Sequence, residues 1–292
     1  WHGGISGSIP LTIATSGHFE EKLIGVIPTS ATVFSAFNLV IVIALIIILP
    51  LVNRLMLDKN HGHAIDPRLL EKSENSKEKS EEEQDLTPAG KLENSRVLSA
   101  ITGLLGIAFI IYYFAKGQTL NIDFVNFIFL FLGILLHGTP RRYLNAVKEA
   151  VSGASGIIIQ FPFYAGIMGM MVSSGLAADL SNWFVSISND FTFPLFTFIS
   201  AGIVNVFVPS GGGQWAVQAP VMLPAAQELG VSFAKTAMAV AWGDAWTNMI
   251  QPFWALPALA IAGLKAKDIM GFCLIVLIVS GIVIGAGLLF IP

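Results

Sequence analysis

Two short polar segments interrupt apolar stretches of this 292-residue chain, and both carry groups able to bind a small ion. The first is Ser210-Gly211-Gly212-Gly213-Gln214, which follows Pro209 within the apolar stretch 193–226. Glycine lets backbone N–H groups approach a ligand closely. A helix beginning near Gln214 would also direct its N-terminal N–H groups and positive dipole end toward the glycines. This combination favours an anion.

Neutral side chains could add hydrogen bonds to an anion held at these glycines. Ser210 and Gln214 lie in the segment itself, and Gln218 lies one helical turn beyond Gln214. The alternative is that the glycines only let helices pack closely, as small residues do in membranes. Three consecutive glycines beside a proline exceed what packing needs, so we favour the anion site.

The second polar segment, 242–252, contains Asp244, the only carboxylate well inside an apolar span. A carboxylate at membrane depth is costly and indicates a functional site. We expect Asp244 to hold a coupling ion, either Na⁺ or a proton, with further ligands on the same segment: Thr247, Asn248 and Gln251. The alternative is a structural acid that accepts hydrogen bonds from the N–H groups of a broken helix.

A third segment, residues 3–10, has the same character, with glycines, serines and a proline beside apolar residues. If the fold has inverted repeats, this is the equivalent broken helix of the first repeat, and Ser6 and Ser8 are further substrate ligands. A plain polar end is the alternative. Because the chain begins with Trp1 and residues 1–11 resemble the middle of a protein, we expect an N-terminal portion to be absent.

The composition places these segments in a membrane. The chain is 54% hydrophobic and 12% charged, whereas soluble domains average about 25% charged residues. Residues 52–96 carry eight of the 16 Lys and Arg residues and ten of the 19 Asp and Glu residues, which predicts a solvated loop. No nucleophile–base pair has usable spacing, so no enzyme, bound metal or cofactor is expected. Nothing indicates a nucleic-acid partner; the expected surroundings are a lipid bilayer.

The apolar stretches define an all-α polytopic protein. We expect a re-entrant hairpin at 193–226, a broken helix at 233–263, and complete spans at about 32–52, 97–115, 122–137, 155–175 and 268–290. Lys and Arg are enriched in cytoplasmic loops. This rule places residues 53–96, 141–148 and 265–267 inside, and it is satisfied only if 193–226 enters and leaves on the outer side.

The chain contains four motifs, which are WHGGISGSIPL at 1–11, QFPFYAG at 160–166, VPSGGGQW at 208–215 and QPFWALPALAIAG at 251–263. In these motifs the chain resembles the bacterial short-chain fatty acid transporter family. The resemblance extends over essentially the whole chain. Two departures occur at positions of interest, since relatives can carry Glu at position 244 and His at position 214.

The resemblance implies an inverted-repeat secondary transporter with a re-entrant hairpin and broken helices, similar to members of the ion transporter superfamily. On that basis residues 1–30 end the first repeat, 31–52 form a transmembrane helix, 53–96 form a cytoplasmic loop and 97–292 form the second repeat. It also implies a multi-pass protein of the bacterial inner membrane and a possible homodimer.

The expected function is secondary active transport of small monocarboxylates of the acetoacetate or butyrate type, coupled to a cation or proton. Lys and Arg are absent from the middle of the apolar spans, which disfavours a dicarboxylate because its second charge would need a fixed cation. Two alternatives stay open. One is transport of another organic anion, such as a dicarboxylate or lactate. The other is a non-transporting fragment that requires a partner half.

Overall fold

The structure is a computed structural model that describes residue 4 and residues 7–57, 87–251, 254–255, 258–259 and 264–292. Within these ranges every regular element is a helix and no residue forms a β-strand, which confirms the predicted all-α class. Three of the described helices are long and apolar enough to cross a membrane: α4 (Ala36–Met56), α7 (Arg96–Ala115) and α15 (Ala266–Phe290). Ser6, Pro252 and most of the charged loop, residues 58–86, lie outside the described residues.

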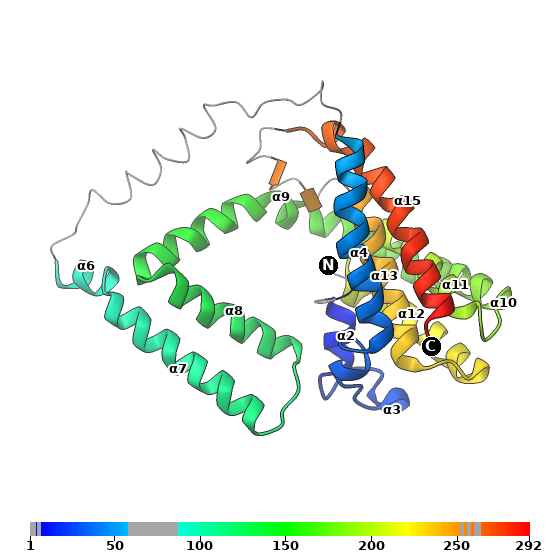
Figure 1. The fold of residues 1–292 in the computed structure, drawn as a ribbon, viewed down its shortest axis with the longest axis horizontal. Coiled ribbons are helices and arrows are strands. Elements are labelled where there is room, and N and C mark those ends of the chain that lie inside the picture. Colours follow the sequence, from blue (N-terminus) through cyan, green and yellow to red (C-terminus); the bar gives the residue numbers. More distant parts are fainter. Residues whose placement is uncertain (1–3, 5–6, 58–86, 252–253, 256–257, 260–263) are drawn as a thin grey trace. The chain divides into compact units, whose positions relative to one another are not determined.

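The chain divides into two compact units, each of which is described by itself (Figure 1). One unit contains residues 1–61, 157–256 and 265–292, and the other contains residues 62–156 and 257–264. Residues 97–292 contribute to both units. Their assignment to a second repeat stays a prediction.

The smaller unit is built around α7 and α8 (Ile122–His137), which pack against each other (Figure 1). The short α6 (Pro88–Glu93) precedes them. Gly106 of α7 lies so close to Phe131 of α8 that a methyl group on the glycine would collide with the ring. The Asn121 side chain caps α8 by accepting a 2.9 Å hydrogen bond from the Phe124 N–H. Both helices match the spans expected from the sequence.

Helix α9 (Pro140–Ser173) differs from the sequence prediction at its start. The expected span began near residue 155, after a polar connection, whereas the helix begins at Pro140 and includes Arg141, Arg142 and Lys148. Proline suits the first turn of a helix, and no proline occurs between 141 and 161 to end it. Polar residues therefore continue the helix instead of forming a loop.

The larger unit contains two antiparallel helices where the hairpin is predicted. Helix α11 (Phe193–Phe207) ends before Val208, and α12 (Gly211–Leu229) begins after Ser210. The 15 residues of α11 correspond to about 22 Å, less than the roughly 30 Å hydrocarbon core of a bilayer. This length agrees with a helix that enters the membrane without crossing it. The short α10 (Leu176–Ser186) contacts both helices.

Helix α13 (Phe233–Thr247) packs more closely against α11 than against any other described element. A methyl group on Gly243 of α13 would collide with the Phe198 carbonyl oxygen and the Ala201 side chain. This close packing explains a correction to the predicted break at 242–252. The helix continues through Gly243 and Asp244, and regular α-helix ends only at Thr247, where the 3₁₀ turn η2 (Asn248–Ile250) follows.

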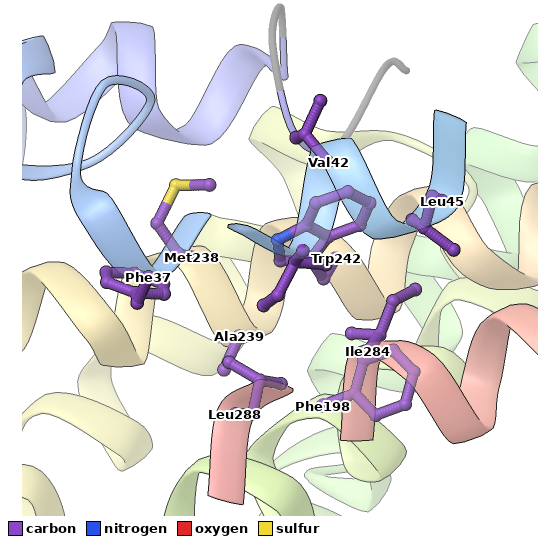
Figure 2. Packing of buried hydrophobic residues seen from close by; sticks show 10 residues of the cluster. Phe37, Val42, Leu45, Phe198, Met238, Ala239, Trp242, Ile284 and Leu288 are labelled. Carbon is purple, nitrogen blue, oxygen red and sulfur yellow. The ribbon is translucent and has the colours of Figure 1, made fainter. Parts of the chain in front are cut away.

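Two buried clusters hold these helices together. In Figure 2, Trp242 of α13 lies among side chains of α4, α11 and α15, including Val42, Phe198 and Ile284. Its Nε1 donates a 3.0 Å hydrogen bond to Oδ1 of the buried Asn38. The second cluster joins α12 and α13 to the short α2 (Ser8–Ile13). The unit also contains α3 (Glu21–Ile24) and the 3₁₀ turn η1 (Thr29–Ala31). Packing of α2 therefore brings the start of the chain to the hairpin.

Candidate functional site

The tip of the hairpin presents the beginning of α12 to the other helices of the larger unit. Ser210 precedes the helix, and its Oγ is a distant acceptor, 3.4 Å from the Gly213 nitrogen. No heavy atom of the described part of the chain lies within 4 Å of the position that a Cβ on Gly212 would take. The backbone of Gly212 is therefore approachable, as a site that binds a ligand through N–H groups requires.

Gly211, in contrast, is tightly surrounded by residues of two other helices. A methyl group on it would collide with Oγ of Ser8 from α2, and it would lie 3.3 Å from Oδ2 of Asp244 from α13. Three segments far apart in the sequence thus meet at the first residue of α12. Of the predicted ligands, the structure brings together Ser8, the glycine segment and Asp244.

Asp244 is almost fully buried, with 4% of its surface exposed. Its carboxylate faces Gly211, so the negative charge lies at the N-terminal, positive end of the α12 dipole. Its carbonyl oxygen lies on the other side of the residue and accepts a 2.7 Å hydrogen bond from Nδ2 of Asn205 in α11. One residue therefore contacts both helices of the hairpin.

The other predicted coupling-ion ligands gather around Asn205, which the sequence reasoning missed. Its Nδ2 lies 2.9 Å from Oγ1 of Thr247 and 2.8 Å from Oδ1 of Asn248. Nε2 of Gln251 donates a 2.8 Å hydrogen bond to the Asn205 carbonyl oxygen. The available signal was the one amide of α11, in its last turn, where a buried polar side chain indicates interhelical hydrogen bonding.

Gln214 and Gln218 lie inside the hairpin, and neither side chain is exposed. Nε2 of Gln214 donates to the Ala201 carbonyl oxygen at 2.7 Å and to Oε1 of Gln218 at 2.8 Å. Nε2 of Gln218 lies 3.2 Å from the hydroxyls of Ser181 in α10 and Ser200 in α11. These amides join three helices behind the tip. Their direct contact with a substrate stays a prediction.

The acid–base and metal chemistry of the described residues is sparse. Among them, no three His, Cys, Asp or Glu side chains cluster as they would around a metal ion. The lysine of α13, Lys235, lies near the start of the helix, and its Nζ donates a 2.6 Å hydrogen bond to the Ile291 carbonyl oxygen. The site around Gly211 therefore combines backbone N–H groups, neutral oxygens and one carboxylate. Such a set can bind a small anion together with a monovalent cation or proton.

Several described helices are long enough to cross a membrane, and the hairpin tip meets α13 at a polar centre near the end of that helix. These features define the class of polytopic membrane transporters. The model of the family described as "Short chain fatty acid transporter" matches residues 1–291. The chain therefore belongs to the short-chain fatty acid transporter family.

Two curated relatives carry the name "Putative short-chain fatty acid transporter". The protein from Escherichia coli K12 is 46% identical over 290 residues, which cover 99% of this chain and 66% of the relative. The protein from Haemophilus influenzae is 44% identical over 300 residues, which cover 100% of this chain and 67% of the relative. The chain thus spans about two thirds of the length of these relatives. No solved structure matches it.

Proposed function

We propose that this protein carries short-chain monocarboxylates, such as butyrate and acetoacetate, across the bacterial inner membrane together with a cation or a proton. The observation that carries this proposal is the position of the Asp244 carboxylate beside Gly211. The same helix N-terminus that would receive the substrate carboxylate already faces a protein carboxylate.

This arrangement couples the substrate to a positive charge. A helix N-terminus is equivalent to about half a positive charge, which is too little to offset two carboxylates in a site shielded from water. A cation or proton bound at Asp244 removes the repulsion between them. The substrate anion and the coupling ion therefore bind as a pair, and neither is carried efficiently alone.

The charge balance also favours a monoanion. Lys235 lies more than two helical turns from Asp244 along α13, and its Nζ donates to the Ile291 carbonyl oxygen. No lysine or arginine occurs in 193–229, the segment that forms the hairpin. A second carboxylate would thus be desolvated without a counter-ion, which is costly. A small acyl group would fit near Gly212, because no described heavy atom lies within 4 Å of a Cβ at this position.

We infer that the hairpin and the broken helix move together, because hydrogen bonds and close packing connect them. The Thr247 hydroxyl donates a 2.8 Å hydrogen bond to the Gly202 carbonyl oxygen, and Asn205 contacts the same end of α13. Gln218 connects α12 to α10 through Ser181. In the proposed cycle, substrate binding closes the tip, and these helices then shift relative to their flanking helices. A homodimer belongs to the same proposal.

Competition for uptake tests the substrate class. Purified full-length protein in liposomes should accumulate labelled butyrate under an imposed Na⁺ or pH gradient. Unlabelled propionate and acetoacetate should reduce the uptake, whereas succinate at equal concentration should not. Uptake of labelled succinate in preference to butyrate would overturn the proposed substrate class, and liposomes lacking protein are the control.

A further inference from the structure

The amide of Asn205 has an unusual set of neighbours. The residue is fully buried, and its Nδ2 lies 2.7 to 2.9 Å from three oxygens, namely the Asp244 carbonyl oxygen, Thr247 Oγ1 and Asn248 Oδ1. An amide nitrogen has only two hydrogens, so it cannot give each oxygen a well-directed hydrogen bond. On the opposite side, Asn205 Oδ1 has no hydrogen-bond partner among the described residues. A buried acceptor without a partner is costly and requires an explanation.

Each of the three oxygens has a lone pair directed at the amide nitrogen of Asn205. Asn248 Oδ1 uses its other lone pair to accept a 3.0 Å hydrogen bond from Trp254 Nε1. The Thr247 hydroxyl donates its hydrogen to the Gly202 carbonyl oxygen, which leaves its oxygen only as an acceptor toward Asn205. The Asp244 carbonyl oxygen lies where α13 gives way to η2, and the Asn248 N–H is directed to the Trp246 carbonyl oxygen. Carbonyl oxygens at such a helix end are typical cation ligands in transporters.

We propose that these oxygens form a binding site for an alkali-metal cation, and that Asn205 is its fourth ligand. The two ends of an asparagine amide have nearly the same shape, so half a turn about χ2 exchanges them without moving the backbone. The turn directs Oδ1 at the cation between the other three oxygens. Oδ1 has no partner among the described residues where it now lies, so turning it toward the cation breaks no hydrogen bond of this oxygen.

The ligand set determines the class of cation. All four oxygens belong to neutral groups, which are one carbonyl, one hydroxyl and two amides. Calcium and magnesium sites in proteins normally include carboxylates, and transition metals prefer nitrogen or sulfur ligands. Neutral oxygens that replace a hydration shell are the chemistry of Na⁺ and K⁺ sites. A monovalent cation therefore fits this site, and Na⁺ and K⁺ are distinguished by experiment.

This inference rests on the proposed function, because it assigns the coupling charge to a particular position. The cation binds the carbonyl oxygen of the residue whose carboxylate faces Gly211. Its positive charge then lowers the negative potential at the hairpin tip, where the substrate anion would bind. Asn205 belongs to α11 and the other ligands belong to α13 and η2, so the bound cation also connects the hairpin to α13.

Thermal unfolding of the purified full-length protein tests the site without requiring transport. Midpoints are compared in NaCl, KCl and choline chloride at equal ionic strength, because a ligand that binds only the folded state raises the midpoint. We expect Na⁺ or K⁺, but not choline, to raise it in a saturable manner. Identical midpoints in all three salts would overturn the proposal.

Two substitutions remove single ligands, and a third is their control. Thr247→Val keeps the shape of the side chain but removes Oγ1, and Asn205→Leu removes the amide. Each should weaken the cation affinity by about 10- to 100-fold, as expected for one lost interaction with a charge. The control is Thr197→Val, because Thr197 is also buried in α11 and its hydroxyl donates a 3.7 Å hydrogen bond to the Met222 sulfur, away from the proposed ligands. It should leave the cation response unchanged.

The outcome separates a ligand from a structural hydrogen bond. If Thr247→Val lowers the midpoint equally in NaCl and choline chloride and keeps the wild-type cation response, Thr247 is only structural and the proposal is wrong. This variant also decides the matter if Asn205→Leu does not fold. Butyrate binding is measured in the same salts. Butyrate binding without any cation response would reject the cation site and leave the proposed monocarboxylate binding standing. A cation response without butyrate binding would support the cation site and reject monocarboxylate binding.

Discussion

Gly211 and Gly212 are adjacent at the start of α12 but have different surroundings. A Cβ on Gly211 would collide with Ser8, whereas a Cβ on Gly212 would meet no heavy atom of the described residues within 4 Å. Neither glycine has a positive φ, so alanine is compatible with the backbone at both positions. Packing explains why Gly211 is a glycine. The approach of a ligand is the explanation that we propose for Gly212.

Gly212→Ala therefore separates a ligand site from a packing site. The substitution should leave the thermal midpoint unchanged or slightly higher, because alanine is favoured over glycine in helices by about 1 kcal/mol. It should weaken butyrate binding by about tenfold, since the methyl group occupies the approach to the backbone N–H groups. Calorimetric titration and thermal unfolding measure the two effects. Unchanged butyrate affinity would place the anion elsewhere.

Gly211→Ala is the matched comparison. Its methyl group has no space beside Ser8 Oγ, so it should lower the thermal midpoint, with a cost of about 1–3 kcal/mol for overpacking. A midpoint equal to that of Gly212→Ala would contradict the close contact between α2 and the hairpin tip.

At the scale of residues, the sequence indicated as candidate site residues the ones whose chemistry is unusual for a membrane segment. Asp244 and the glycine segment were found because charge and helix-breaking residues are costly there. Asn205 was not found, because one amide in an apolar helix does not reveal its partners 39 to 43 positions later. Its role depends on the contact between α11 and α13, which only the folded chain provides.

At the scale of elements, the contact between α11 and α13 depends on glycines that face the other helix. Gly243→Ala should lower the thermal midpoint, because its methyl group would meet the Phe198 carbonyl oxygen, and backbone cannot move away cheaply. We expect a cost of about 1–3 kcal/mol. Gly271→Ala in α15 is the control, since within the described ranges no heavy atom lies within 4 Å of a Cβ at that position. Equal midpoints for the two variants would show that this helix contact is looser than described.

The amide network behind the tip gives a further prediction at this scale. Gln218→Leu removes hydrogen bonds to Gln214, Ser181 and Ser200 and should destabilise the protein by about 1–3 kcal/mol. Butyrate affinity of the folded protein should stay near the wild-type value if Gln218 only supports the hairpin. Weaker binding with an unchanged thermal midpoint would instead indicate direct substrate contact.

Hydrophobic patterning was sufficient to locate the helices but not all of their ends. The span expected at 122–137 coincides with α8, and that at 97–115 differs from α7 by one residue. The start of α9 and the end of α13 were misplaced, because local composition does not register the tertiary packing that keeps Gly243 helical. The break at 208–210 was located correctly, because proline and consecutive glycines act locally.

At the scale of the whole molecule, the distribution of charges predicts a topology. Asp190 lies in the connection before α11, and Lys267 lies at the start of α15. A re-entrant hairpin places them on opposite sides of the membrane, whereas a hairpin segment that crosses once would place both outside. In a Cys273→Ser background, Asp190→Cys should react with an impermeant maleimide in intact spheroplasts. Lys267→Cys should react only after permeabilisation, and its labelling in intact spheroplasts would contradict the re-entrant hairpin.

The central claim is that the Asp244 carboxylate couples anion binding at the hairpin tip to a positive charge. The most direct test is butyrate uptake into liposomes containing the Asp244→Asn variant of the full-length protein, with and without imposed Na⁺ and pH gradients. Asp179→Asn is the matched control, because Asp179 is exposed on α10. We predict that Asp244→Asn abolishes gradient-driven accumulation, whereas Asp179→Asn accumulates butyrate as the wild type does. Gradient-driven accumulation by correctly inserted Asp244→Asn protein would contradict the account.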